Sequence, residues 1–494
     1  MNRRQFFIFS ASAVVLACAQ GRTLTSGSSA RSSSIQTSVE GLLQVDLEAR
    51  RETVNLAGRQ VTLLSYNGQI PGPQLVAYPG DTVRIRCTNQ LSNPTNLHYH
   101  GLHIPPTGQA DNIFLKIPRG ETLTYEFTIP REHPGGNFYY HPHVHGLVAD
   151  QVFGGLGGLF IIRGELDQIP EVQAASERFL FLKDFAIAAN DPLLGQHGHP
   201  MAHMGGREGS LITVNGQVNP ILTIASGGLL RLRCVNASNA RFYRLALEEH
   251  PFYLIATDGI PLAEPVELRD LLLSPGERVE VLVRGDRPPG QYQLLDLPYD
   301  RGSMGMMGPG HMGPGHMGPG HMGPRHRGPR GSEWPGRTEA GRPLPLATLR
   351  YRGQVSKQPL PQQLLPIEPL SHPQTLRQFT LDHGMGRVFL INGQAFDHQR
   401  VDTRVMLNTV EDWEIVNVGV MDHPFHLHTN PFQVLSRNGV AMPYRAWKDT
   451  VLVPVGASVK LRVQFKDFPG KTVYHCHILD HEDLGMMGLL DIQV

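Results

Sequence analysis

His475-Cys476-His477-Ile478-Leu479-Asp480-His481-Glu482-Asp483-Leu484-Gly485-Met486, near the C-terminus, is the stretch around which this sequence is organised. Side chains alternate between the two faces of a strand, so His475 and His477 point to one side and Cys476 to the other. His481 and the thioether of Met486 can complete the sulfur side. A thiolate, two imidazoles and a weak axial methionine form the ligand set of a blue copper site, and the second imidazole must come from elsewhere. On this stretch alone, a zinc site or unrelated histidines remain an equal alternative.

Three further histidine groups lie outside this stretch: His98-Tyr99-His100, His141-Pro142-His143 and His423-Pro424-Phe425-His426-Leu427-His428. Together with His475 and His477 they make four H-x-H pairs, each with two imidazoles on one strand face. Eight imidazoles suit a cluster of about three metals better than a single ion. His423 is left over and can supply the missing imidazole beside Cys476. Zinc is disfavoured because a structural zinc site closes with four ligands and needs no axial methionine.

The composition indicates an all-β protein without a disulfide framework. Lys+Arg and Asp+Glu are 44 each, so no net basic charge points to nucleic acid as a partner. Four cysteines in 494 residues are too few for a disulfide scaffold. The 53 glycines and 39 prolines separate short runs of alternating apolar and polar residues, as in strands joined by turns.

One unit occurs three times along the chain. Asn67-Gly68-Gln69, Asn215-Gly216-Gln217 and Asn392-Gly393-Gln394 each precede an alternating strand that ends in asparagine, at Asn89, Asn236 and Asn417. A second echo follows at Pro118-Arg119-Gly120-Glu121, Ser274-Pro275-Gly276-Glu277 and Val453-Pro454-Val455-Gly456. Repeats at domain spacing predict three related β-sandwiches. Cys87 and Cys234 occupy matching strand positions, as expected of buried structural thiols.

We therefore divide the chain into three domains and a leader. The domains span residues 44–165, 166–355 and 376–494, and 356–375 form a linker. Residues 1–43 read as an export signal with a Ser-rich tether. Arg3-Arg4 precedes an apolar run from Phe6 to Ala17 that is too short to span a bilayer, which suggests the twin-arginine route and a periplasmic or extracytoplasmic location. Cys18 follows a lipobox-like sequence and is a candidate lipid anchor.

A methionine-rich segment, residues 304–326, interrupts the second domain. Its density of glycine and proline opposes regular structure. Thioether and imidazole ligands select soft Cu(I), so we expect copper recruitment here, against the alternative of an insertion without a role. The residues concerned are Met304, Met306, Met307, His311, Met312, His316, Met317, His321 and Met322. A weaker patch of the same kind comprises His197, His199, Met201, His203 and Met204.

The four histidine motifs, in this order, resemble those of three-domain multicopper oxidases, close to bacterial laccases and periplasmic cuprous oxidases. The resemblance covers residues from about 44 to 494 and implies three cupredoxin-like Greek-key β-sandwiches. It implies four copper ions, with the trinuclear cluster between the first and third domains. By this resemblance, the type 1 copper is held by His423, Cys476, His481 and Met486, the type 2 copper by His98 and His426, and the type 3 pair by His100, His141, His143, His428, His475 and His477.

The resemblance also implies an activity. Such an oxidase takes one electron at a time from phenolic donors or Cu(I) and reduces dioxygen to water. Cys476 is joined through the backbone to His475 and His477, which gives each electron a short covalent path. Asp111 and Glu482 are expected to relay protons, although either could be an ordinary solvated carboxylate. We expect a monomer with a role in copper tolerance. The alternative is a non-catalytic copper-binding or buffering protein.

Overall fold

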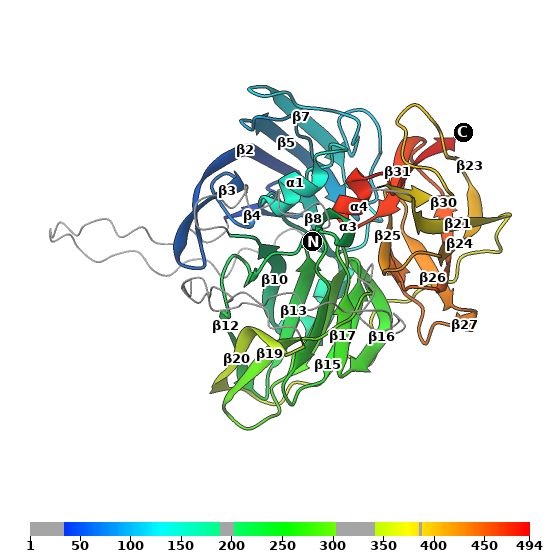
Figure 1. Ribbon diagram of the computed structural model, residues 1–494. Coiled ribbons are helices and arrows are strands. Elements are labelled where there is room, and N and C mark those ends of the chain that lie inside the picture. Colours follow the sequence, from blue (N-terminus) through cyan, green and yellow to red (C-terminus); the bar gives the residue numbers. More distant parts are fainter. Residues whose placement is uncertain (1–33, 188–201, 303–340, 385–387) are drawn as a thin grey trace, which may run out of the picture. The chain divides into compact units, whose positions relative to one another are not determined.

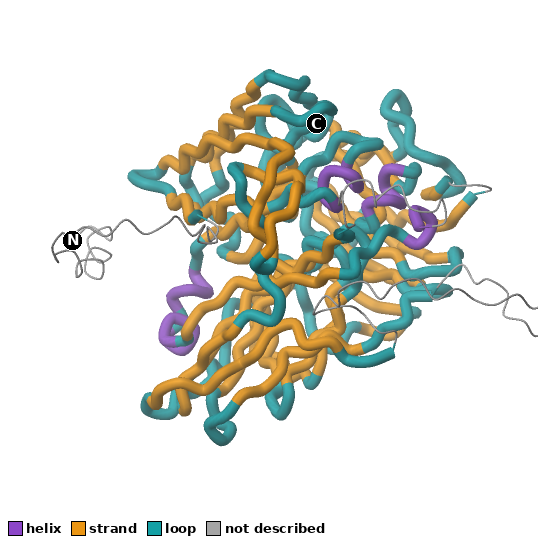
Figure 2. Tube along the Cα trace, turned by 60° about the vertical axis from the view of Figure 1, so that its left-hand side comes forward, coloured by secondary structure: helices purple, strands orange, loops and turns teal. Residues whose placement is uncertain are grey.

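Strands dominate the part of the chain that the structure describes. The computed structural model describes residues 34–187, 202–302, 341–384 and 388–494, all of which belong to one compact unit. Figure 1 and Figure 2 show strands throughout this part, with only a few short helices between them. The predicted all-β class is thereby confirmed. No helix in these ranges is long and apolar enough to cross a bilayer.

The strands form six sheets, two from each third of the chain. The first sandwich combines the sheet β1 (Ile35–Thr37), β4 (Gly72–Ala77), β9 (Gly158–Ile162), β8 (Gly136–His141) and β6 (His98–His100) with the sheet β3 (Arg59–Tyr66), β2 (Leu42–Leu56), β5 (Thr82–Asn89) and β7 (Thr122–Thr128). The second combines the sheet β11 (Leu211–Val214), β10 (Ser176–Phe185), β13 (Leu229–Asn236), β18 (Arg278–Arg284), β15 (Phe252–Thr257) and β16 (Ile260–Leu268) with the sheet β12 (Ile221–Ser226), β20 (Leu344–Gln354), β19 (Gln291–Leu297), β14 (Tyr243–Leu247) and β17 (Asp270–Leu273).

The third sandwich carries the C-terminal motifs. Its larger sheet contains β22 (Phe389–Ile391), β21 (Thr375–His383), β24 (Thr409–Asn417), β30 (Ser458–Phe465), β26 (Phe432–Arg437) and β27 (Val440–Ala441), and β28 (Trp447–Lys448) pairs with β26. The other sheet contains β23 (Thr403–Met406), β32 (Met487–Gln493), β31 (Gly470–Cys476), β25 (His423–Leu427) and β29 (Thr450–Val453). Within this sheet β31 lies between β32 and β25, so Cys476 is in a central strand.

The threefold repeat seen in the sequence is confirmed by local geometry. Asn67, Asn215 and Asn392 have φ of 55°, 54° and 53°. Each precedes a glycine that also has positive φ, which is the backbone of a type I′ hairpin turn. The asparagines that end β5, β13 and β24 also match, because each side-chain amide donates to a carbonyl further along its own sandwich, at Ile117, Leu273 and Val453. The same sequence signals thus build the same contacts three times.

Each sandwich has its own apolar core, formed by the inward residues of these strands. Val83, Ile85 and Cys87 face the first core, and Leu230, Leu232 and Cys234 face the second. Both thiols are unpaired and buried, as predicted. Burial of such side chains stabilises the fold by roughly 1.5–3 kcal/mol each.

Two segments extend the predicted architecture. Ile35–Thr37, within the predicted leader and tether, forms β1 and pairs in parallel with β4. The tether prediction was therefore wrong for these residues, which pair with β4 at the edge of the sheet despite the serine-rich composition around them. Residues 355–374 contain no helix or strand. They form backbone hydrogen bonds with the second sandwich, for example from Leu364 N–H to the Ala263 carbonyl.

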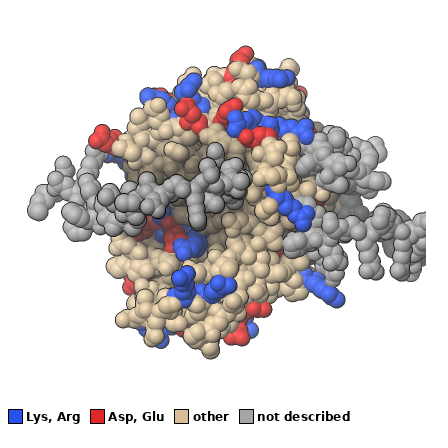
Figure 3. All heavy atoms as spheres, turned by 90° about the vertical axis from the view of Figure 1, so that its left-hand side faces the viewer, with Lys and Arg blue, Asp and Glu red and all other residues tan. Residues whose placement is uncertain are grey.

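Short helices occupy the junction of the three sandwiches. α1 (Val148–Phe153), α3 (Ala202–Gly205) and α4 (Leu479–Asp483) come from the first, second and third sandwich and contact one another around α4 (Figure 1). The other two, η2 (Glu165–Gln168) and α2 (Pro170–Ala174), join the first sandwich to the second. On the face drawn in Figure 3, described acidic and basic side chains are interspersed among wide uncharged areas.

Candidate metal centres

Cys476, His423 and His481 meet at the end of β31 and form what we call, together with Met486, the thiolate site. Cys476 Sγ lies 3.4 Å from His423 Nδ1 and 3.8 Å from His481 Nδ1, and the two nitrogens are 3.3 Å apart. A first-row metal about 2.0–2.3 Å from each ligand requires ligands spaced by roughly 3.3–4 Å. The three atoms therefore fit one metal ion. All three side chains are buried.

Backbone hydrogen bonds hold the rest of the thiolate site. Cys476 N–H donates to the Met486 carbonyl, and Met486 N–H donates to the His481 carbonyl, so the buried Met486 is fixed beside both ligands. Ile478 N–H donates to Cys476 Sγ at 3.4 Å, which stabilises a thiolate. The His481 ring stacks on Phe389 at 3.8 Å, and its Nε2 lies 3.1 Å from the Met204 carbonyl of α3. The second sandwich thus orients a ligand held by the third.

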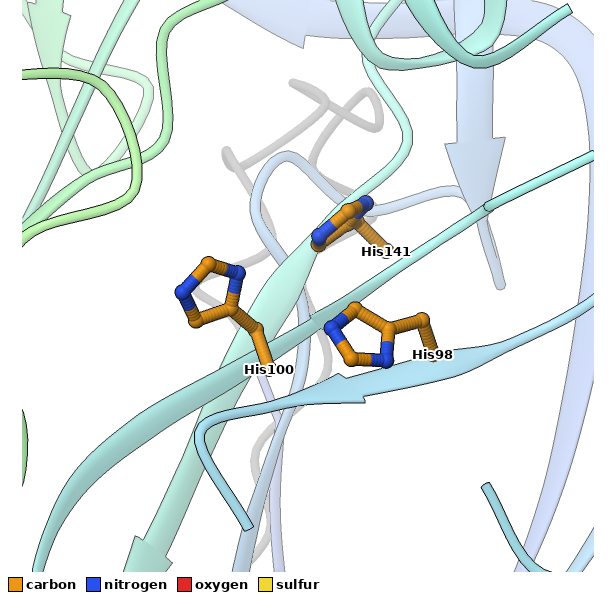
Figure 4. A group of neighbouring side chains, drawn as sticks. All are labelled: His98, His100 and His141. Carbon is orange, nitrogen blue, oxygen red and sulfur yellow. The ribbon is translucent and has the colours of Figure 1, made fainter. Parts of the chain in front are cut away.

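The eight other histidines predicted as metal ligands gather between the first and third sandwiches and form what we call the histidine cluster. Strand pairing explains the gathering, because His98 lies opposite His141 across β6 and β8, and His426 lies opposite His475 across β25 and β31. Figure 4 shows His98 and His100 from one strand and His141 from its neighbour, with the three rings around a common space. The cluster consists of His98, His100, His141, His143, His426, His428, His475 and His477, each at most 2% exposed.

Histidines of the first sandwich stack on those of the third. His98 stacks on His428 and His100 on His426, with ring centroids 3.9 Å apart in both pairs. His475 Nε2 lies 3.2 Å from His143 Nε2 and 3.0 Å from His428 Nε2, so these three nitrogens surround one point. His98 belongs to two further ligand groups, one with His100 and His141 and one with His426 and His428.

His477 is the one histidine of the cluster that belongs to none of the ligand groups found among the described residues. Its ring lies 4.9 Å from that of His100, and its Nε2 is 3.0 Å from the Tyr139 hydroxyl. Its Nδ1 is buried without a partner in the described part of the chain. The structure therefore places His477 at the cluster, with its Nε2 beside the Tyr139 hydroxyl.

Unpaired ring nitrogens show that the cluster suits metal ions. Among the described residues, Nε2 of His98, His141 and His426 is buried without a hydrogen-bond partner. The other ring nitrogen, Nδ1, is hydrogen-bonded in each case. Its partner is the Asp111 carboxylate for His98, the Pro142 carbonyl for His141 and the Asp449 carbonyl for His426. A metal-binding histidine has this arrangement, because the anchored N–H fixes the tautomer and leaves a lone pair for the ion. The soft thiolate and the imidazole set fit copper well.

Two buried carboxyl groups lie behind the histidines. Asp111 Oδ1 and Oδ2 are 2.9 and 3.1 Å from His98 Nδ1, and burial raises the pKa of Asp111 to about 8 against the opposing effect of the Tyr99 N–H. Glu482 is fully buried, 3.6 Å from His143 Nδ1 and 3.3 Å from His475 Nδ1. Burial raises its pKa well above the usual value. Both predicted acids therefore contact the cluster and are not solvated carboxylates.

Burial should make the copper-free protein sensitive to acid. It lowers the pKa of His141 and of His423 to about 3, and it lowers the pKa of His98, His143 and His475 well below the usual value, whereas an unfolded histidine titrates near 6.5. At these histidines the unfolded chain binds more protons than the folded chain between about pH 3 and 6.5, which lowers the free energy of unfolding as the pH drops below 6.5. Asp111 and Glu482 act in the opposite direction, because their raised pKa values let the folded chain hold protons that the unfolded chain releases. The buried histidines outnumber these two acids, so we expect a net loss of stability. Each histidine contributes up to about 1.4 kcal/mol per pH unit, so two of them cost about 4 kcal/mol at pH 5.

Chemical denaturation of the copper-free protein at pH 7, 6 and 5 measures this slope. His141→Gln should reduce it by about 1.4 kcal/mol per pH unit, because one titrating ring is gone. A slope in His141→Gln equal to that of wild type would contradict a neutral buried ring at position 141.

Several residues of the site could not be seen in the sequence. Asp449 and Thr450 contact His100 and His426, and Asp480 of α4 accepts hydrogen bonds from Arg207 and Asn239 of the second sandwich. Asp483 accepts from Gly146, Val148 and Ala149 N–H at the start of α1, in the first sandwich. These residues contact partners that are far away in the sequence, so no local motif predicts their role.

The predicted Cu(I) residues are only partly described. Met304 to Met322 lie outside the described residues, as do His197, His199 and Met201. Of the second soft patch, His203 is bonded to Asp480 at 3.1 Å and Met204 is buried beside His481. Gly302, the last described residue before the methionine-rich segment, packs on Val420 and Met421, next to His423.

Comparisons with known proteins agree with this geometry. Three family models, each described as multicopper oxidase, match residues 48–167, 182–304 and 369–493. A multicopper oxidase of Staphylococcus haemolyticus is 30% identical over 87% of this chain and 83% of its own length. A cell division protein of Xenorhabdus nematophila is 28% identical over 87% of this chain and 85% of its own. The structure of a Campylobacter jejuni multicopper oxidase, described as a metallo-oxidase, superposes with a TM-score of 0.78 at 28% identity and covers 94% of this chain and 95% of that one.

Proposed function

Because the chain belongs to the multicopper oxidase family and has its cupredoxin-like sandwiches, we propose that it couples one-electron oxidation of Cu(I) or phenolic donors to four-electron reduction of dioxygen to water. The observation that carries this proposal is the adjacency of the thiolate site and the histidine cluster. Cys476 belongs to the first, and its neighbours His475 and His477 belong to the second. The proposed type 1, 2 and 3 assignment is the one that the family resemblance implies, with the type 1 ion at the thiolate site and three ions in the cluster.

Copper bound at these places would supply one-electron chemistry between a donor at the thiolate site and dioxygen in the cluster. The protein provides the covalent path from Cys476 to the flanking histidines. It excludes bulk water from the cluster, whose rings are all buried. Asp111 and Glu482 hold protons at carboxyl oxygens within reach of His98, His143 and His475, where dioxygen reduction needs them.

Access to the thiolate site favours Cu(I) over a bulky phenol. The side chains of His423 and His481 are 1% and 0% exposed, and α3 and Phe389 cover His481. Asp422 N–H donates to the Arg301 carbonyl at 2.8 Å. This hydrogen bond holds the segment around Arg301 against the residues that precede His423. The methionine-rich segment starts directly after these residues. The related Campylobacter jejuni protein is described as a metallo-oxidase, which supports the same donor class.

Oxygen uptake by the copper-loaded full-length protein tests the function. Cu(I) and a substituted phenol should be compared at matched concentrations in an oxygen electrode, with peroxide assayed alongside. Uptake with water as the product is expected, faster with Cu(I). Firm copper binding without oxygen uptake on either donor would instead favour a non-catalytic copper-binding protein. The similarity to a cell division protein makes this alternative worth testing.

Deleting residues 304–326 should lower the Cu(I) oxidation rate several-fold and leave the phenol rate equal or higher. A segment rich in soft methionine and histidine ligands can collect Cu(I), whereas oxidation of a phenol needs no such ligands. The deletion shortens a loop between two paired strands, β19 and β20, and so lowers the closure entropy. Both rates must be measured at confirmed full copper loading. Equal losses on both donors would refute the recruitment role.

We further propose export by the twin-arginine route to the periplasm or another extracytoplasmic space, where the oxidase would act in copper tolerance as a monomer. Arg3-Arg4 and the apolar run that follows support the route, and Cys18 is the candidate for a lipid anchor. Cell fractionation of wild-type protein and of Arg3→Lys/Arg4→Lys tests export, and Cys18→Ser tests the anchor.

A further inference from the structure

The second sandwich supplies none of the expected copper ligands, yet one of its turns reaches the histidine cluster. We call Ser274–Arg278, which leads into β18, the second-sandwich turn. Gly276 in this turn has φ of +86° and lies flat against His477, because a Cβ atom there would be 2.8–3.0 Å from three atoms of the imidazole. The turn therefore packs directly against a histidine of the cluster.

Arg278, the last residue of this turn, is fully buried and joins all three sandwiches. Its Nη1 and Nη2 donate to the two carboxylate oxygens of Asp449 in the third sandwich, at 2.6 and 2.5 Å. Its Nε donates to the Asn137 carbonyl in the first sandwich, and the remaining N–H groups reach the Gly276 and Asp258 carbonyls in the second. The five N–H donors of the guanidinium thus have five acceptors.

Asp449, which Arg278 holds in place, also contacts two histidines of the cluster. Its Oδ1 is 3.1 Å from His100 Nε2 and 3.4 Å from His426 Nδ1, and its backbone carbonyl accepts from His426 Nδ1 at 2.9 Å. The rings of His100 and His426 are stacked on each other, so one carboxylate sets the position of both. Arg278 in turn fixes both oxygens of that carboxylate.

A glycine next to this contact makes room for the arginine side chain. Gly101 directly follows His100, and a Cβ atom there would be 2.1 Å from Arg278 Nη2 and 2.6 Å from Asp449 Oδ2. Only glycine leaves room for the ion pair. In the other two copies of the repeat, the strands that correspond to β18 begin at Thr122 and Ser458. The long cationic side chain is therefore present in the second copy alone.

We propose that Arg278 is a positioning residue for copper in the histidine cluster, through which the second sandwich orients His100 and His426. This inference rests on the copper occupancy proposed above. Lysine cannot replace the planar bidentate fork of arginine. Residues that orient metal ligands typically contribute about 10–100-fold in metal affinity or activity.

The test compares Arg278→Lys with wild type as copper-loaded full-length proteins. We expect the copper content to fall by about one ion per chain, or the electron paramagnetic resonance signal of imidazole-held Cu(II) to change, while the blue absorption of the thiolate site persists. Copper titration of the cluster should show an affinity lower by about 10–100-fold. These readouts report on the cluster, whereas a purely structural role would change only the unfolding temperature.

Arg233→Lys is the matched control. Arg233 is also a fully buried arginine of the second sandwich, but its partners are Asp167, Glu177 and Glu280. It should lower the unfolding temperature and leave copper content and resonance signal as in wild type. If Arg278→Lys behaves in the same way as Arg233→Lys, the inference is wrong.

A second variant covers the case in which Arg278→Lys does not fold. Asp449→Asn keeps the shape of the side chain but loses its charge, and it should give the same weakened copper binding. Unchanged copper affinity and resonance signal in this variant would overturn the inference. Failure of wild type to hold copper in the cluster would refute the proposed function, whereas full loading of wild type and both variants would refute only the role of Arg278.

Discussion

Cys476→Ser is expected to remove the blue absorption and the turnover of dioxygen together. The thiolate provides the charge-transfer absorption, and the same residue joins the thiolate site to His475 and His477. A serine hydroxyl is a hard and weakly basic ligand, so it replaces neither property. The loss of turnover should exceed about 100-fold, the upper end of what removing a mere supporting residue costs. The absorption spectrum and oxygen uptake with Cu(I) and with a phenol measure both effects.

Two other variants separate the thiolate from general effects of substitution. Cys234→Ser alters a buried thiol in the core of the second sandwich and should retain the blue colour. Met486→Leu should retain both colour and turnover but shift the reduction potential, because an axial thioether mainly tunes it. Wild-type oxidase activity in Cys476→Ser would refute the assignment of the thiolate site, and an unchanged potential in Met486→Leu would refute Met486 as the axial ligand.

The residues that meet at the two candidate metal centres could be predicted from the sequence because each motif is local. An H-x-H pair on a strand puts both rings on one face wherever the strand lies. The structure adds which motifs lie opposite each other, since His98 pairs with His141 and His426 pairs with His475. The same reasoning identified Cys87 and Cys234 as core residues.

The supporting residues could not be predicted because they act across domain boundaries. Arg278 meets Asp449 over 171 positions in the sequence, and Asp480 meets Arg207 over 273. A buried arginine in an alternating strand has the same local pattern as the exposed Arg84 and Arg86 of the first sandwich. Only the packing of three sandwiches decides which charged residues become buried. Likewise, β1 is short and forms only because the edge of β4 is available to it.

His426→Ala should have the opposite signature to Cys476→Ser, with the blue colour retained and oxygen uptake reduced by more than about 100-fold. His426 Nε2 points into the cluster without another partner in the described part of the chain, and its Nδ1 is held by the Asp449 carbonyl. The methyl group of alanine offers no ligand, whereas Cys476, His423 and His481 remain in place. A donor should therefore still bleach the protein.

The return of the blue colour in air distinguishes the two sites. In wild type, the colour should reappear quickly after the donor is consumed, because dioxygen reoxidises the protein through the cluster. In His426→Ala, and equally in His98→Ala, the colour should bleach at the normal rate and return far more slowly. His250→Ala is the control, since this histidine bonds to Tyr351 within the second sandwich and should change neither rate. Sustained oxygen uptake by His426→Ala together with a lost blue band would reverse the assignment of the two sites, because the cluster would then not be where dioxygen is reduced.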